Sequence, residues 1–233
     1  MNYLYLKGKK SKFKITALIS LLLSSFINIA QASDMEKRIE IAQFNNITLA
    51  KGLDVTIICK DTLPYVIANG SRKVLDKLQV DVHQKKLSIM GTAKDYDSWD
   101  FADNKATLKI YTNTPIETVR IMFGVKFTAD ACAISKKELN INGSMGANFA
   151  INGQTEKLNA ELSMGTTFNS DIDTFKVDTA NVSMAMGAEA NLCNAKVING
   201  SVAMGGIVYI GSHTIDNINA TMGAMVKTRN CKL

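Results

Sequence analysis

The feature that most constrains this chain is a repeat in its second half, where a bulky residue precedes a glycine once per unit. These pairs are Phe123-Gly124, Met145-Gly146, Met164-Gly165, Met186-Gly187, Met204-Gly205 and Met222-Gly223. Successive glycines are 22, 19, 22, 18 and 18 residues apart. A period of about 20 residues is typical of a solenoid, whose rungs bury their apolar faces only against neighbouring rungs. The repeat therefore predicts an all-β, β-helix-like solenoid of about six rungs over residues 116–233.

Within each repeat, the residues at odd distances from the glycine are apolar or small. In the third repeat they are Ala160, Leu162, Met164, Thr166 and Phe168. A period of two is that of a β-strand, whose successive side chains point to opposite faces. We therefore expect the odd positions, including the methionine before each glycine, to form the core. Methionines stacked inward at strand spacing could not converge on one metal ion.

Small residues occupy the position two before most of these glycines, namely Ser144, Ser163, Ala185, Ala203 and Thr221. Two interpretations stay open. In the first, the glycine turns the corner of the coil in a conformation that other residues resist. In the second, the strand continues through the glycine, and the small residues form a docking stripe for another protein or a second copy of this one.

Asparagines between the glycine markers favour turns, because Asn tolerates left-handed backbone angles. The residues concerned are Asn142, Asn152, Asn169, Asn194, Asn199 and Asn217. We predict that they lie at corners of the coil. Stacking of asparagines between rungs is an alternative that the pattern does not separate from turn preference.

The first 32 residues have the three parts of a secretory signal peptide. Lysines at positions 7, 9, 10, 12 and 14 precede a mostly apolar run of 16 residues, 15–30, and Ala30-Gln31-Ala32 offers a cleavage site. A membrane anchor is the alternative, but a span needs about 20 apolar residues. We therefore predict cleavage near Ser33, export to the periplasm or the cell surface, and no membrane span in the mature chain.

Removal of this segment changes the charge balance. The whole chain has 27 Lys and Arg against 21 Asp and Glu, but residues 1–32 hold five lysines and no acid. The remaining chain has 22 basic and 21 acidic residues, a net charge of +1. Nucleic-acid binding, which needs a basic surface on the folded domain, is therefore not expected.

Four cysteines follow the predicted cleavage site, and an exported chain can form disulfides. Cys132, Cys193 and Cys231 fall in the first, fourth and sixth repeats. Rungs two apart are separated by about 10 Å, whereas a disulfide tolerates Cα separations only up to about 7 Å. We predict no bridge among these three cysteines, and a Cys59–Cys132 bridge stays open. The chain has no CxxC pair, so no zinc site is expected.

Residues 33–115 are predicted to form a β-rich region that caps the first rung, since terminal rungs need a cap. Alternating apolar residues indicate strands around Val55, Leu87 and Leu108, and residues 71–78 indicate one short helix with Ser71 as its N-cap.

Four segments of this region carry a resemblance to a known family: FNNI at 44–47, GLDVTI at 52–57, VLDKL at 74–78 and KLSI at 86–89. They resemble the opening of the putative auto-transporter adhesin family with a head GIN domain. GSMG at 143–146 and its successors resemble the Ser-Gly turns that follow in that family. The resemblance covers nearly the whole chain after residue 32 and implies an exported β-helix-like protein of bacterial envelopes.

Residues that could support catalysis are sparse. His83 and His213 are the only histidines, and they fall in different regions. A polysaccharide-cleaving solenoid would carry acids on adjacent rungs, whereas Asp171 and Asp173 of one repeat are the best pair here. We therefore expect no enzyme, no cofactor and no metal centre.

One loop has the composition of a binding site. Tyr96, Asp97, Trp99 and Asp100 place the only tryptophan beside carboxylates, a set that could stack on a sugar or hold a cation. The alternative is a hairpin loop whose aromatic rings pack on the protein body.

These patterns together predict a non-catalytic cell-envelope solenoid for adhesion or assembly. Its partners would be a protein or glycan at the envelope, or a second copy. The alternative is a carbohydrate-active or carbohydrate-binding protein that uses an outer face of the solenoid or the 96–101 loop.

Overall fold

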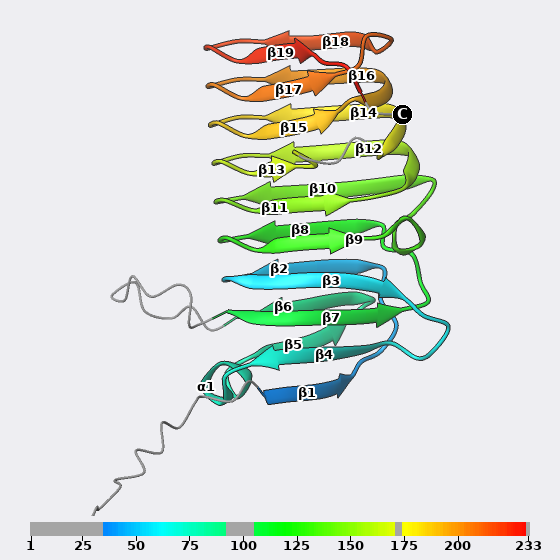
Figure 1. The fold of residues 1–233 in the computed structure, drawn as a ribbon, viewed down its shortest axis with the longest axis vertical. Helices are drawn as coiled ribbons and strands as arrows, with labels where there is room; N and C mark the ends of the chain where they lie inside the picture. The colour runs from blue at the N-terminus through cyan, green and yellow to red at the C-terminus, as the bar shows by residue number, and fades with distance from the viewer. Residues whose placement is uncertain (1–34, 92–104, 171–173, 232–233) are drawn as a thin grey trace, which may run out of the picture. The chain divides into compact units, whose positions relative to one another are not determined.

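The computed structural model describes residues 35–91, 105–170 and 174–231, which belong to one compact unit, residues 32–233. Strands of these residues form a ten-stranded and a nine-stranded sheet. In Figure 1 the strands of both sheets lie one above another in successive layers. In spatial order, the ten-stranded sheet contains β1 (Met35–Glu40), β4 (Tyr65–Gly70), β7 (Ala106–Thr112), β3 (Leu53–Cys59), β9 (Lys126–Ala129), β11 (Asn148–Ile151), β13 (Thr167–Phe168), β15 (Glu189–Leu192), β17 (Ile207–Ile210) and β19 (Met225–Thr228). The nine-stranded sheet contains β18 (Ile215–Ala220), β16 (Asn194–Val202), β14 (Lys176–Met184), β12 (Gln154–Leu162), β10 (Glu138–Ser144), β8 (Thr118–Met122), β2 (Asn46–Ala50), β6 (Lys86–Met90) and β5 (Gln79–His83).

From β8 onward, each repeat supplies one strand to each sheet, and equivalent strands of successive repeats pair in parallel. Ile141 of β10, for example, lies between Val119 of β8 and Ala160 of β12. The all-β solenoid predicted from the repeat is confirmed, with about five turns where the sequence indicated about six rungs.

The earlier part of the chain continues both sheets. β2 pairs in parallel with β8, and β3 with β9. Lys51 and Gly52, with φ of 70° and 63°, connect β2 to β3 by the same kind of turn that the later repeats use. Antiparallel pairing then closes this end, through β1 with β4, β4 with β7 and β5 with β6. A β-rich cap is therefore confirmed, and its boundary at residue 115 stays a prediction.

The predicted short helix is present as α1 (Arg72–Leu75), the single α-helix of the described residues. Ser71 precedes it in an extended conformation but its side chain makes no capping hydrogen bond. Val74 and Leu75 are buried and anchor the helix to the core. A 3₁₀ turn, η1 (Ala131–Ala133), follows β9.

The core lies between the two sheets and follows the predicted alternation at most odd positions. Ala160, Leu162, Thr166 and Phe168 of the third repeat are all buried. Aromatic rings of successive rungs stack there: Phe127 and Phe168 lie 6.3 and 6.2 Å from Phe149 between ring centroids. Such pairs add about 0.5–1.5 kcal/mol to the stabilisation from burial.

The methionine before each glycine is the exception, and its predicted place in the core is wrong. Met145, Met164, Met186, Met204 and Met222 are exposed, with φ between 49° and 54°, and the glycines after them have φ between 69° and 75°. Positive φ at both central residues defines a type I′ turn. The strand period therefore stops one residue before the methionine, and the turn directs its side chain to the solvent.

The asparagine prediction is correct at two corners and wrong at several others. Asn169 has a φ of 51° and is buried at a corner, where its side chain exchanges hydrogen bonds of 2.7 and 2.8 Å with the backbone of Ile151. Asn152 also lies at a corner, between β11 and β12. The other four lie within strands: Asn142 in β10, Asn194 and Asn199 in β16, and Asn217 in β18.

Two disulfides join all four cysteines. Cys59 and Cys132 pair with a Cα separation of 6.1 Å, as the sequence left open. The pairing of Cys193 with Cys231, at 5.7 Å, contradicts the prediction that these two stay apart. The error lay in the register: Cys231 lies beyond β19, and the chain there returns over Gly211. A Cβ at Gly211 would lie 3.1 Å from the sulfur of Cys231, so this glycine leaves room for the bridge.

Candidate functional site

The turns that connect the nine-stranded sheet to the ten-stranded sheet stack directly on one another and form what we call the turn edge. The Gly146 amide donates a hydrogen bond of 2.9 Å to the carbonyl of Met164, and the Gly165 amide donates one of 3.0 Å to that of Met186. Gly187 and Gly205 repeat this contact in the following rungs. Each turn is thus held one strand spacing, about 4.8 Å, from the next.

An exposed row of methionines results, which we call the methionine ladder: Met145, Met164, Met186, Met204 and Met222. Their exposed fractions are 43, 43, 46, 50 and 76%. Phe123, at 39%, continues the row at its first turn. Contiguous exposed apolar side chains usually mark an interaction site, whereas isolated ones do not. The turn edge is therefore the leading candidate for a functional surface.

The residues predicted as a docking stripe lie beside this ladder. Ser144, Ser163, Ala185, Ala203 and Thr221 each take the first position of a turn. The Ser163 carbonyl accepts a 3.2 Å hydrogen bond from the Thr166 amide, which closes the turn. The glycines therefore turn the corner, and the strands do not continue through them. Thr221 is exposed and the other four are half-buried, so a row of small side chains borders the methionines.

A second row, the asparagine ladder, runs along the outer face of the nine-stranded sheet. Asn159 donates to Asn140 at 2.8 Å, Asn181 to Asn159 at 3.0 Å, Asn199 to Asn181 at 3.4 Å and Asn217 to Asn199 at 2.9 Å. The sequence left such stacking open for Asn199 and Asn217, but Asn140, Asn159 and Asn181 were not among the residues named. The signal for this row was an asparagine six residues before the glycine in five successive repeats.

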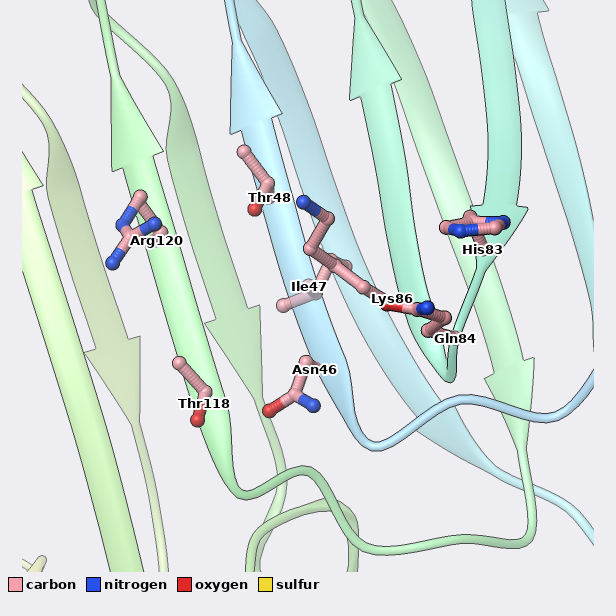
Figure 2. A pocket seen from close by; sticks show the side chains of 8 residues that line it. All are labelled: Asn46, Ile47, Thr48, His83, Gln84, Lys86, Thr118 and Arg120. Carbon is pink, nitrogen blue, oxygen red and sulfur yellow. The ribbon is translucent and has the colours of Figure 1, made fainter.

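A shallow pocket of about 260 Å³ lies on the same sheet, over β2, β8 and the β5–β6 hairpin. Figure 2 shows its lining residues: Asn46, Ile47, Thr48, His83, Gln84, Lys86, Thr118 and Arg120. Lys86 and Arg120 make this lining basic, and it contains no carboxylate. The pocket could hold an anionic group, but it offers no acid and base pair for hydrolysis.

Aromatic and cationic side chains gather where β1, β4 and β7 meet. The rings of Tyr65 and Tyr111 stack with centroids 4.5 Å apart, and the Arg38 guanidinium lies 3.7 Å from the Tyr65 centroid. A hydrogen bond to the Glu40 carboxylate raises the pKa of Arg38. These contacts attach β1 to the sheet, and we assign them a structural role.

The other predicted residues are not brought together or cannot be placed. Tyr96, Asp97, Trp99, Asp100, Asp171 and Asp173 lie outside the described residues, as does the predicted signal peptide. His83 ends β5, and His213 lies between β17 and β18. Residues 35–91, 105–170 and 174–231 contain no group of three or more His, Cys, Asp or Glu side chains suited to a metal. No helix within these ranges is long and apolar enough to cross a membrane.

Comparison with known families identifies the chain. The family of putative auto-transporter adhesins with a head GIN domain matches residues 43–213, which include the cap and nearly all of the solenoid. The chain belongs to this adhesin family. No match was found among curated proteins.

Solved structures share the fold of this adhesin-family chain. A putative adhesin from Bacteroides fragilis NCTC 9343 is 11% identical with a TM-score of 0.62, and the match covers 84% of this chain and 97% of that one. A putative lipid binding protein from Parabacteroides distasonis ATCC 8503 is 12% identical with a TM-score of 0.50, and the match covers 86% and 98%. At these identities the similarity concerns the fold alone.

Proposed function

We propose that this adhesin-family chain is a non-catalytic module that is exported to the cell envelope and binds a protein surface there through its turn edge. The observation that carries the proposal is the methionine ladder beside the docking stripe. Methionine is flexible and polarizable, and it is frequent on surfaces that adapt to several partners. The small stripe residues would let a partner backbone approach the ladder closely.

Export is supported by two independent features. The N-terminal segment has the charge, apolar run and cleavage site of a signal peptide. The two disulfides would persist in an oxidising compartment such as the periplasm or the cell surface. The adhesin family is consistent with this location.

A bulky substitution in the stripe tests the proposal. Labelled protein would be titrated onto an immobilised envelope fraction of the source organism, and its mass would be measured by light scattering. Ser163→Trp should reduce retention at least tenfold, because the indole would block the approach to the ladder. Ser183→Trp is the matched control, since Ser183 is exposed on β14 outside the stripe. Equal retention and equal mass for both variants would remove the turn edge as the docking surface.

The asparagine ladder favours a second candidate, carbohydrate binding on the outer face of the nine-stranded sheet. Its amides repeat at strand spacing and could donate to and accept from the hydroxyls of an extended glycan. On a glycan array, Asn159→Ala would abolish binding if this face is used. Trp99→Ala would abolish it if the 96–101 loop is used instead.

A further inference from the structure

We propose that the methionine ladder binds a soft monovalent metal ion, Cu(I) or Ag(I), between the thioether sulfurs of stacked methionines. This inference goes beyond the docking function and does not depend on it. Thioethers are soft ligands that select Cu(I) over the hard cations. The prediction that the sulfurs cannot serve a metal assumed that they point into the core, and the exposed ladder removes that assumption.

Methionine is an unusual residue at the first central position of these turns. The first central position of a type I′ turn requires a positive φ, for which Asn, Asp and Gly are preferred. Five successive turns instead carry methionine. Leucine would offer a similar apolar surface at a similar backbone cost, yet it stands at none of these positions. The backbone therefore does not explain methionine, and the thioether sulfur is what distinguishes it from leucine.

The spacing of the ladder also favours this proposal. Adjacent strands lie about 4.8 Å apart, and hydrogen bonds from glycine to methionine hold consecutive turns at that spacing. A metal–sulfur bond is about 2.3 Å, taking the zinc–thiolate length as a guide. If an ion lies midway between two stacked sulfurs, these two sulfur atoms must be about 4.6 Å apart. The rotatable bonds of methionine allow this adjustment without backbone movement.

No cysteine of this chain competes with the methionines for a soft ion. The chain has four cysteines, and both disulfides together engage all four. No thiolate is therefore present to bind the ion more strongly in the oxidised protein. The sulfur that remains for a soft ion is the thioether of methionine, and the ladder presents five of these in consecutive rungs.

Two double variants with equal numbers of substitutions separate stacked sulfurs from mere methionine content. Met164→Leu with Met204→Leu leaves Met145, Met186 and Met222, none of which are on adjacent rungs. Met145→Leu with Met222→Leu leaves three methionines on consecutive rungs. Leucine keeps the surface apolar and tolerates the turn as methionine does, so both variants should fold like the original chain.

The test uses the protein as the cell produces it, with its disulfides intact. Cu(I) affinity would be measured anaerobically by competition with bicinchoninate. Ag(I), added as the nitrate in chloride-free buffer, would be followed by the NMR shifts of ¹³C-labelled methionine methyl groups. We expect shifts at the ladder methionines and at least a tenfold loss of affinity for the 164/204 variant, with less than a threefold change for the 145/222 variant.

Three results would overturn the proposal. The first is no metal binding by the original chain, and the second is an equal loss of affinity in both variants. The third is NMR shifts confined to methionines outside the ladder. Met90 is one such methionine: it is 42% exposed, but it lies in a strand, where it pairs with Ala50 and Gln79. None of these results would contradict the docking proposal. Its test measures retention of the Ser163→Trp variant, which keeps every methionine, and does not measure metal binding.

Discussion

Replacing Met164 by asparagine should change the free energy of unfolding by no more than about 1 kcal/mol, although it removes a large apolar side chain. Met164 is 43% exposed, so it retains roughly half of the 1.5–3 kcal/mol that full burial would supply. Its φ of 51° costs an ordinary residue about 1–2 kcal/mol. Asparagine tolerates this region of the backbone map much better. The two effects oppose each other and are of similar size.

Met184 provides the matched control, because it lies two residues before Met186 but is only 3% exposed in β14. Met184→Asn should destabilise the protein by at least about 3 kcal/mol, since truncation of a core methionine alone costs about 2–5 kcal/mol. The buried amide would add to that loss. The contrast between the two variants is therefore expected to exceed about 2 kcal/mol.

Urea unfolding followed by far-ultraviolet circular dichroism measures both changes. The slope of the free energy of unfolding against urea concentration should be the same for all variants. Equal slopes would show that unfolding exposes the same surface area in each, so that the midpoints can be compared. If Met164→Asn destabilises the protein as much as Met184→Asn does, Met164 belongs to the core. The description of the turn edge would then be wrong.

Three further outcomes follow from the packing. Phe149→Ala should cost about 3–5 kcal/mol, because this ring lies buried within the aromatic stack; thermal unfolding checks this, and an unchanged midpoint would contradict the stacked core. Gly165→Ala should cost only about 1–2 kcal/mol, because an added Cβ meets no atom within 4 Å and only the φ of 69° is unfavourable; a larger loss in urea unfolding would mean that the site is crowded. Replacing Cys193 and Cys231 by serine should cost about 4 kcal/mol, since the bridge spans a sequence separation of 38; free thiols in the untreated protein would show that this bridge does not form.

The solenoid could be predicted because the sequence shows both of its periods, that of the repeat and that of the strand. The 20-residue spacing of the glycines gave the rungs, and the alternation within a repeat gave the buried positions, as Leu162 and Phe168 show. What failed was the extension of that alternation through the turn to Met164. Methionine carries no turn preference, so only the following glycine signalled that the strand had ended.

Other features depend on contacts between different rungs, which a single repeat does not reveal. Cys231 lies beyond the last strand, where the register no longer fixes the path of the chain. Asparagine as a residue type favours turns, yet Asn159 and Asn181 lie in strands, where their side-chain amides are hydrogen-bonded to each other. The turn between β2 and β3 escaped notice because Lys51, not a bulky apolar residue, precedes its glycine. The docking stripe and the 96–101 loop stay predictions.

Oxidation footprinting tests most directly whether the methionines line the outside of a stacked turn edge. Brief treatment of the folded protein with hydrogen peroxide converts accessible methionines to sulfoxides, which peptide mass spectrometry can locate. We predict that the ladder methionines are oxidised well before Met184, which is buried in β14 of the nine-stranded sheet. Equal protection of the ladder methionines and Met184 would contradict the account.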